Sequence, residues 1–324
     1  MKKLLLGSAL AASVLLAGSS FAETKVSGYL ETTINTKEDS TASVTGDSTP
    51  ATIGHEANID LKTTKELDNG FTMSAGFGIE NGTQADQYLK LTSGGTTFAI
   101  GNDVTGVADN VSYEDFTGSI AQDTHTNGGA KGSLSGVKTN HGGNGLYLIQ
   151  KMDLATIEAV YSPSTTSNTT AGSSVGGVSG SGYDVAVHGG FGVEGLKIGY
   201  GISNKTTDTS STGDIEGKTF GAKYSISGLT IGAGRTTNTA SDDVDTEISE
   251  YGISYQINDQ LSIGFTDTTL EKDAVAIDEE FNSFQVGYDF GGMGITLGLY
   301  QAENVGGVSG TDEESFEIRT VTKF

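Results

Sequence analysis

The 324-residue chain contains no cysteine and no tryptophan, only two prolines and only two arginines. Without cysteine no disulfide can stabilise the fold, so stability must come from an extended hydrogen-bonded architecture. Apolar residues never recur at a sustained helical spacing, which excludes a largely helical protein. Beyond the N-terminal region, no apolar run approaches the roughly eighteen residues that a membrane-spanning helix needs.

Positive charge is also scarce. The chain has 18 lysines and arginines against 41 aspartates and glutamates, which gives a net charge of -23. Such a surface repels phosphate groups, so we expect no nucleic acid partner.

The N-terminus is the one strongly apolar segment. Lys2 and Lys3 precede an apolar run over 4–17 and a small-residue site at Ser20-Phe21-Ala22. This pattern is typical of a cleaved secretory signal, and the run is too short for a transmembrane helix. We therefore predict a signal peptide over 1–22 and an exported mature domain over 23–324.

The mature chain alternates between apolar and polar residues at period two. In the segment 71–80, Phe71, Met73, Ala75, Phe77 and Ile79 share one parity, and the other parity holds Thr, Ser, Gly and Glu. The same alternation recurs at 25–36, 196–203, 251–257 and 284–290. Each segment is therefore predicted to be a strand with one apolar face and one polar face.

The links between these strands alternate in length. Short links with good turn residues occur at 68–70, 94–95, 153–154, 192–195, 227–228, 258–259 and 291–294. Long polar links occur at 37–52, 81–85, 102–143, 162–181, 204–216, 238–245, 271–279 and 304–311. This rhythm predicts an all-β fold, a transmembrane antiparallel β-barrel of about 16 strands with short periplasmic turns and long extracellular loops. A closed barrel satisfies every backbone polar group in lipid.

Soluble β-sandwiches, solenoids and calcium-binding repeats also show alternation. A sandwich does not explain the short and long rhythm of the links, and a solenoid needs a fixed repeat that is absent here. The end of the chain also favours the barrel, because apolar and polar residues alternate from Glu314 to a terminal phenylalanine, Phe324.

Three segments, in this order, resemble the general porins of Gram-negative outer membranes, which are trimeric sixteen-stranded channels. They are Leu67-Asp68-Asn69-Gly70-Phe71, Gly95-Thr96-Thr97-Phe98-Ala99-Ile100-Gly101-Asn102 and the terminal Phe324. The resemblance implies an outer-membrane homotrimer through which small hydrophilic solutes and ions diffuse passively. It also implies contact with outer-membrane lipid and lipopolysaccharide, and a role for Phe324 in the signal that the barrel-assembly machinery reads.

The longest link, 102–143, is too long for a loop without a role in a compact protein. The resemblance implies that it folds into the barrel and narrows the pore. Its acidic first half, with Asp103, Asp109, Glu114 and Asp115, is then the predicted constriction. The alternative is that these acids are solvated loop charges.

The resemblance also implies basic side chains on the wall opposite the acidic loop. The candidates on the polar parity of their strands are Lys62, Lys90 and Arg319, which could equally be ordinary luminal charges. An arginine cluster of the kind common in the family cannot form, because Arg235 and Arg319 are the only arginines. A thin basic wall beside many acids is expected to favour cations.

An enzyme is not expected. The histidines His55, His125, His141 and His188 are scattered and fall in no recognisable Ser/His/Asp arrangement. The segment 190–195 matches G-x-G-x-x-G but opens no helix, so it is predicted to be a turn. The acids at 242–247 lack the calcium-loop glycine, and we expect no metal and no cofactor. The alternative function is that of an adhesin or a structural protein of the cell surface.

Overall fold

The computed structural model describes residues 23–39, 48–101, 145–163, 181–206, 214–240, 245–273 and 275–324. Within these ranges no helix is long and apolar enough to span a membrane. The strands are β1 (Glu23–Asp39), β2 (Ser48–Glu66), β3 (Thr72–Glu80), β4 (Thr83–Ser93), β5 (Thr96–Gly101), β6 (Gly145–Lys151), β7 (Thr156–Ser162), β8 (Gly182–Gly189), β9 (Leu196–Lys205), β10 (Ile215–Ile226), β11 (Leu229–Ala240), β12 (Asp245–Gln256), β13 (Leu261–Lys272), β14 (Glu279–Asp289), β15 (Met293–Glu303) and β16 (Glu313–Lys323).

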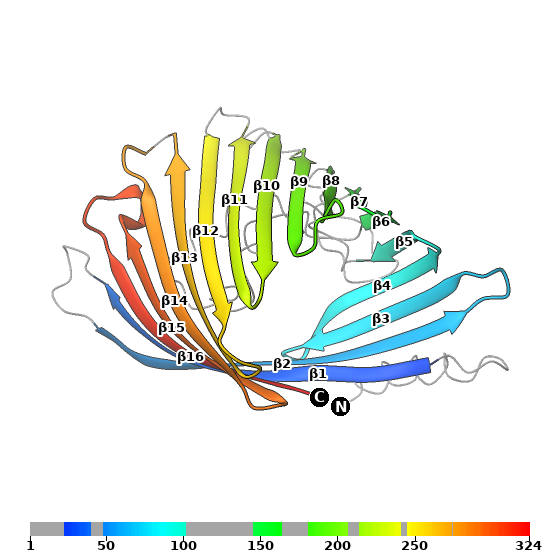
Figure 1. The fold of residues 1–324 in the computed structure, drawn as a ribbon, viewed down its shortest axis with the longest axis horizontal. Helices are drawn as coiled ribbons and strands as arrows, with labels where there is room; N and C mark the ends of the chain where they lie inside the picture. The colour runs from blue at the N-terminus through cyan, green and yellow to red at the C-terminus, as the bar shows by residue number, and fades with distance from the viewer. Residues whose placement is uncertain are drawn as a thin grey trace.

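Each strand pairs antiparallel with its neighbours in sequence, and β1 pairs with β16 to close the barrel (Figure 1). At this seam the Gly28 amide donates to the Phe324 carbonyl at 2.9 Å, and the Phe324 amide donates to the Gly28 carbonyl at 3.0 Å. Every described strand pairs with a neighbour on both sides over part of its length, which closes the sheet as a barrel in lipid requires. β2 extends past the end of β3, so its residues before Asn58 pair with β1 alone. The prediction of an all-β antiparallel barrel with sixteen strands is confirmed.

The barrel has two unlike ends. Short links follow the even-numbered strands from β2 to β14, and we call the end of the barrel where they lie the turn end. The opposite end is the loop end. The link between β3 and β4, at the loop end, is only Asn81-Gly82. Both residues have positive φ, 47° and 80°, as a two-residue type I′ turn requires.

The expectation of a long loop over 81–85 is therefore wrong. Thr83 and Gln84 are already part of β4, because they pair with Glu80 and Ile79. Their polarity made them look like loop residues, but Thr83 lies opposite Glu80 on the inner parity, where a strand that meets water needs no apolar residue.

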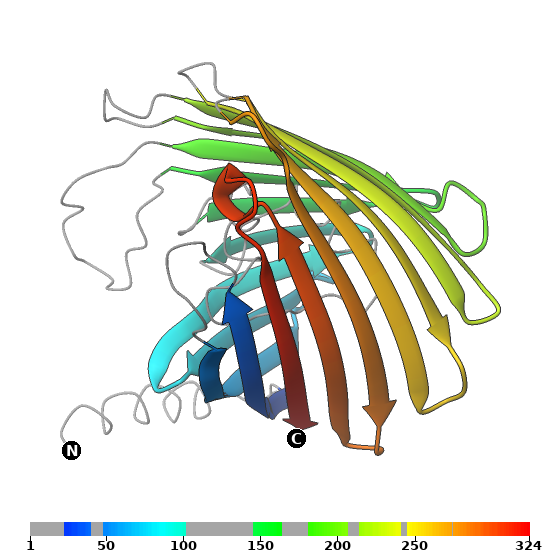
Figure 2. The same ribbon diagram turned by 90° about the vertical axis from the view of Figure 1, so that its left-hand side faces the viewer.

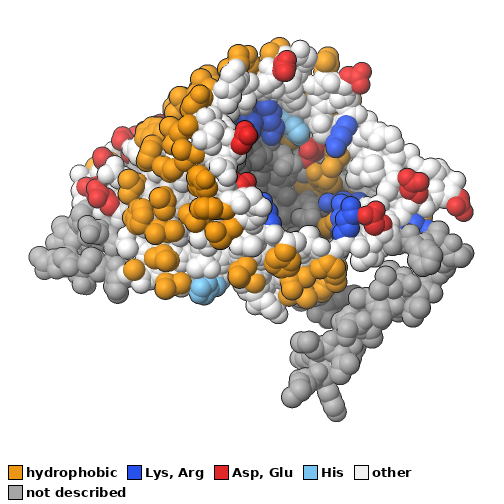
Figure 3. Space-filling view, turned by 60° about the horizontal axis from the view of Figure 1, so that its bottom comes forward, with side chains coloured by type: hydrophobic (Ala, Val, Ile, Leu, Met, Phe, Trp, Pro, Cys, Tyr) orange, Lys and Arg blue, Asp and Glu red, His pale blue; other side chains and the backbone are white. Residues whose placement is uncertain are grey.

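The two faces of the sheet differ as the alternation predicts. On β1, Val26 and Leu30 are at least half exposed on the outer face, whereas Glu31, Thr33 and Asn35 are buried on the inner face. Figure 3 shows apolar side chains gathered on the outer surface and a hollow with charged side chains at its rim. The outer face also carries the exposed aromatic residues expected for a membrane belt: Tyr200, Tyr251, Tyr255, Tyr288 and Phe290.

Two parts of the inner face are apolar among the described residues, which the alternation does not predict; the smaller one holds Val160 and Ala186. Near the loop end, a buried cluster forms on the inner parity of β12 to β15, and Val305 from the β15–β16 link packs against it. Its members are Ile248, Leu270, Phe281, Tyr300 and Ala302. The short helix η4 (Val305–Gly307), seen in Figure 2 above the ends of β15 and β16, covers this patch. Apolar side chains are tolerated here because they face protein instead of water.

Candidate functional site: the inner wall

The inner wall is acidic. Every fully buried charged side chain in the described part of the chain is a carboxylate. By strand parity all of them lie on the inner face: Glu31, Glu158, Asp184, Glu250, Glu279 and Glu317. Buried carboxylates need hydrogen-bond donors or positive charge nearby, so their partners determine what the wall presents to the interior.

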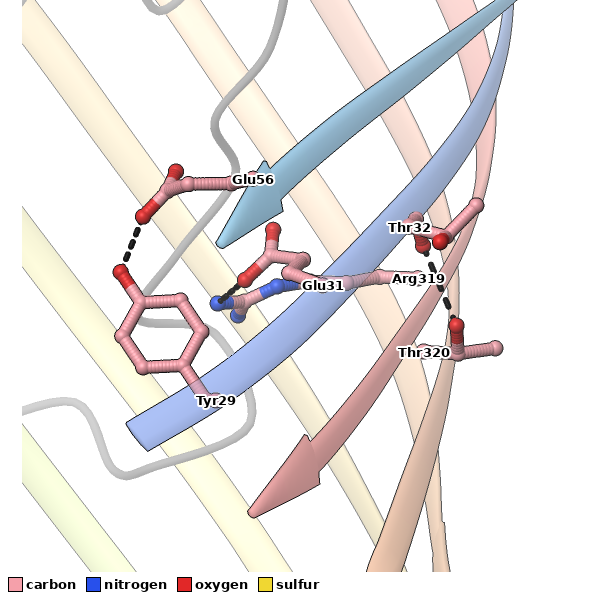
Figure 4. Close-up of polar contacts among 6 residues, drawn as sticks. All are labelled: Tyr29, Glu31, Thr32, Glu56, Arg319 and Thr320. Carbon is pink, nitrogen blue, oxygen red and sulfur yellow. Dashed lines mark hydrogen bonds and ion pairs between the residues drawn. The ribbon is translucent and has the colours of Figure 1, made fainter. Parts of the chain in front are cut away.

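Arg319 and Glu31 form a close charge pair on this wall. The Arg319 Nη2 atom donates to Glu31 Oε2 at 2.6 Å, across the seam between β16 and β1. The Glu31 side chain is 8% exposed and the Arg319 side chain 21%. Figure 4 shows both on the same side of β1, opposite Thr32 and Thr320. Arg319 is therefore largely neutralised by Glu31.

Tyr29 and Glu56 lie beside this pair (Figure 4). The Tyr29 hydroxyl donates to the Glu56 carboxylate, and Glu56 lies directly opposite Glu31 in the β1–β2 register. Like charges directly opposite each other are destabilising. The Tyr29 hydroxyl and the Arg319 guanidinium each take up one of the two carboxylates, which offsets this repulsion.

The other predicted wall bases lie elsewhere. Lys62 faces inward near the turn end, directly opposite Lys25 on β1. Lys90 faces inward on β4, with its Nζ 4.0 Å from the centroid of the Tyr88 ring. The structure brings Lys62 and Lys90 to neighbouring positions across β3, but Arg319 lies much further along β1, beside Thr33. The three bases do not form one cluster.

Sequence reasoning missed a second inner lysine pair. Lys197 on β9 and Lys223 on β10 are directly opposite each other, and both have inner parity. Their parity was readable from the sequence, but the register that pairs them was not. These inner lysines therefore lie in separate groups near the turn end, and Arg319 lies further along the wall, so the bases do not form a single wall.

A third polar group joins β6, β7 and β8. The Tyr147 hydroxyl donates to Glu158 Oε2 at 2.7 Å, and His188 Nε2 lies 2.8 Å from Glu158 Oε1. Both oxygens of this carboxylate are engaged by wall side chains. Glu158 thus links Tyr147 on β6 and His188 on β8 through its two oxygens.

The remaining predicted residues divide into two groups. The acids Asp103, Asp109, Glu114 and Asp115 lie outside the described residues, as does the predicted signal peptide. Phe324 lies at the seam with its ring over Gly28: a Cβ added to Gly28 would lie 2.9 Å from Phe324 Cζ. The absence of a side chain at Gly28 leaves room for the terminal ring.

Arg235, the second arginine, is on the outer face. Its Nη2 atom donates to Glu247, and the strand register on both sides of it is unbroken. Across the described ranges, no group of three His, Cys, Asp or Glu side chains is close enough to hold a metal ion.

Comparisons with known proteins agree with this architecture. A sequence profile described as Gram-negative porin matches residues 9–316. No curated protein sequence matches the chain. Among solved structures, an anion-selective porin from Comamonas acidovorans is 14% identical with a TM-score of 0.69, over 94% of this chain and 100% of that one. OmpF of Salmonella typhi, in complex with daunomycin, is 13% identical with a TM-score of 0.68, and the match covers 94% of this chain and 98% of that one. OmpT of Vibrio cholerae, described as outer-membrane expressed, is 14% identical with a TM-score of 0.64, and the match covers 95% of this chain and 99% of that one.

Proposed function

Since the chain belongs to the Gram-negative porin family, we propose that it is a water-filled outer-membrane channel for small hydrophilic solutes and that it prefers cations. The turn end of the barrel is then periplasmic and the loop end extracellular. The observation that carries the proposal is the acidic inner wall of a closed barrel with an apolar outer face.

The cation preference rests on the balance of the wall charges. Among the described residues every buried charged side chain of the inner wall is a carboxylate, and the one inner arginine is paired with Glu31. Carboxylates along a pore lower the entry cost of positive ions. One solved structure with this fold is an anion-selective porin, so the fold itself leaves selectivity open. Selectivity must therefore come from the charges of this chain.

Further parts of the proposal concern the segment 102–143 and the assembly. We take the acidic half of 102–143, with Asp103, Asp109, Glu114 and Asp115, as the constriction. The channel is proposed to be a homotrimer in contact with lipopolysaccharide, and Phe324 to be part of the signal for the barrel-assembly machinery. The position of Phe324 at the closing seam supports its role in assembly.

Swelling of proteoliposomes tests the channel. Vesicles that contain the refolded mature protein should swell in isotonic arabinose and stay unchanged in a large dextran, because only the small sugar can pass. Protein-free vesicles and vesicles with heat-denatured protein are the controls. Folded protein that causes no swelling in any small sugar would contradict the channel and favour the adhesin or structural alternative.

A further inference from the structure

A group of oxygen-bearing side chains gathers on the inner face of β1, β2 and β3. Tyr29 lies directly opposite Asn58 in the β1–β2 register, and Asn58 lies directly opposite Glu80 in the β2–β3 register. Glu56 is on the same face of β2, two residues before Asn58. We call Tyr29, Glu56, Asn58 and Glu80 the β2 acceptor group.

The acidic members of this group lie close together. The carboxylates of Glu56, Glu80 and nearby Glu31 all interact electrostatically with the Tyr29 phenol, and Glu56 also accepts its hydrogen bond. Glu31 is neutralised by Arg319. Among the residues that the structure describes, no lysine or arginine forms an ion pair with Glu56 or Glu80, so this stretch of wall keeps a local excess of negative charge.

Asn58 supplies the independent observation. Its side chain is only 9% exposed, and its Oδ1 atom has no hydrogen-bond donor among the described residues. A buried amide oxygen without a donor costs free energy, which a ligand that supplies the donor would recover. Its position between Tyr29 and Glu80 places this unused acceptor at the centre of the acidic group.

The tight β3–β4 turn keeps the group near a low rim of the barrel. Glu80 is the last residue of β3, and the Asn81 side chain accepts a hydrogen bond from the Ala57 amide at 3.0 Å. This bond fixes β2 against the turn between Glu56 and Asn58. Glu56, Glu80 and Tyr29 are each partly exposed, so a solute inside the barrel can reach them.

The chemistry of the group selects its ligand. The group offers hydrogen-bond acceptors to a ligand, namely two carboxylates and an amide oxygen. A bare metal ion is a poorer fit, because no three His, Cys, Asp or Glu side chains in the described ranges are close enough together to hold one. An ammonium or guanidinium group carries several N–H donors and spreads its positive charge over a larger volume.

We propose that Glu56, Asn58 and Glu80 form a binding subsite for the ammonium or guanidinium group of a cationic solute. Asn58 Oδ1 accepts one N–H bond and the two carboxylates accept the others. The proposal rests on the proposed function, since the solute reaches this wall through the channel.

Isothermal titration of the folded mature protein in detergent tests the subsite. The probe is L-argininamide, a dication with N–H donors at both ends, and pentamethonium is a dication without N–H groups. We expect argininamide to bind, and its half-saturating concentration to rise about tenfold or more in Glu56→Gln/Glu80→Gln and in Asn58→Leu, because charge-assisted hydrogen bonds are lost. The matched control Asp68→Asn/Asp259→Asn removes the same charge from two exposed turns and should bind as the unaltered protein does.

Three results would overturn the subsite. They are absence of argininamide binding, unchanged binding in both subsite variants, and equally tight binding of pentamethonium or Mg²⁺, which would indicate attraction by charge alone. Heat-modifiable electrophoretic mobility identifies variants that fail to fold. If Asn58→Leu fails to fold, the conservative variant Glu56→Gln/Glu80→Gln still tests the subsite. Bilayer conductance of the same samples separates the two proposals. Conductance without binding contradicts the subsite alone, whereas binding without conductance contradicts the channel and supports the subsite.

Discussion

At the scale of single residues, the chain offers a natural comparison because its two arginines occupy opposite faces. Arg319 pairs with a buried carboxylate on the inner face, and Arg235 pairs with Glu247 on the exposed outer face. The same ionic bond should therefore differ in its effect on stability. Breaking the inner pair leaves an uncompensated charge that the wall encloses, whereas removing Arg235 also removes a charge from the lipid-facing side, and these two effects of its loss offset each other.

Arg319→Met should lower the free energy of unfolding by about 3 kcal/mol, because Glu31 then stays buried without its cation. Arg235→Met should lower it by less than about 1 kcal/mol. Urea titration of the refolded proteins, followed by circular dichroism, measures both. The double variant Glu31→Gln/Arg319→Met should recover most of the loss. Equal effects of the two single variants would show that the Arg319–Glu31 pair has no special role.

Backbone conformation makes a second residue-scale prediction, at Gly82. Gly82 has φ of +80°, whereas Gly294 has no such restriction, and neither glycine has an atom within 4 Å of an added Cβ. Gly82→Ala should therefore lower the free energy of unfolding by about 1–2 kcal/mol, since an L-residue is strained in the left-handed region. Gly294→Ala should be close to neutral. The same urea titration compares them, and a neutral Gly82→Ala would show that the β3–β4 link is not a type I′ turn.

At the scale of the strands, alternation was a reliable guide wherever one face meets lipid. The inward placement of Glu31, Lys62 and Glu80 follows from their parity alone. Parity cannot give the register between strands, however, so the opposition of Tyr29, Asn58 and Glu80 was not predictable. Nor could it give the link at Asn81-Gly82, because the polar start of β4 looks like loop sequence.

The apolar patch on the inner face shows the other limit of parity. Ile248 and Leu270 face inward because the β15–β16 link folds back over them, and this is a contact between segments far apart in sequence. Local pattern carries no signal for such a contact. Val305, the residue that makes it, looked like an ordinary loop valine.

Val305→Asp should release this link from the wall, because a carboxylate cannot remain on an apolar cluster. The expected result is a larger single-channel conductance, since η4 no longer narrows the loop end. Val308 is 57% exposed in the same link, so Val308→Asp is the matched control and should leave the conductance unchanged. If both variants conduct as the unaltered protein does, the link does not limit the pore.

At the scale of the whole molecule, a closed barrel surrounds an acidic inner wall. The barrel class could be predicted from alternation and link length, and the scarcity of arginine already pointed to a thin basic wall. The structure adds that the inner arginine is neutralised and that the inner lysines lie in separate groups. Both observations support a channel in which carboxylates dominate.

The most direct test of this account is the current through the refolded mature protein in a planar bilayer under a KCl gradient. The account predicts stepwise conductance, in groups of three for a trimer, with a reversal potential of cation sign because carboxylates line the path. A reversal potential of anion sign would contradict the selectivity argued from the inner wall. Folded, heat-modifiable protein that inserts and carries no current would contradict the channel itself.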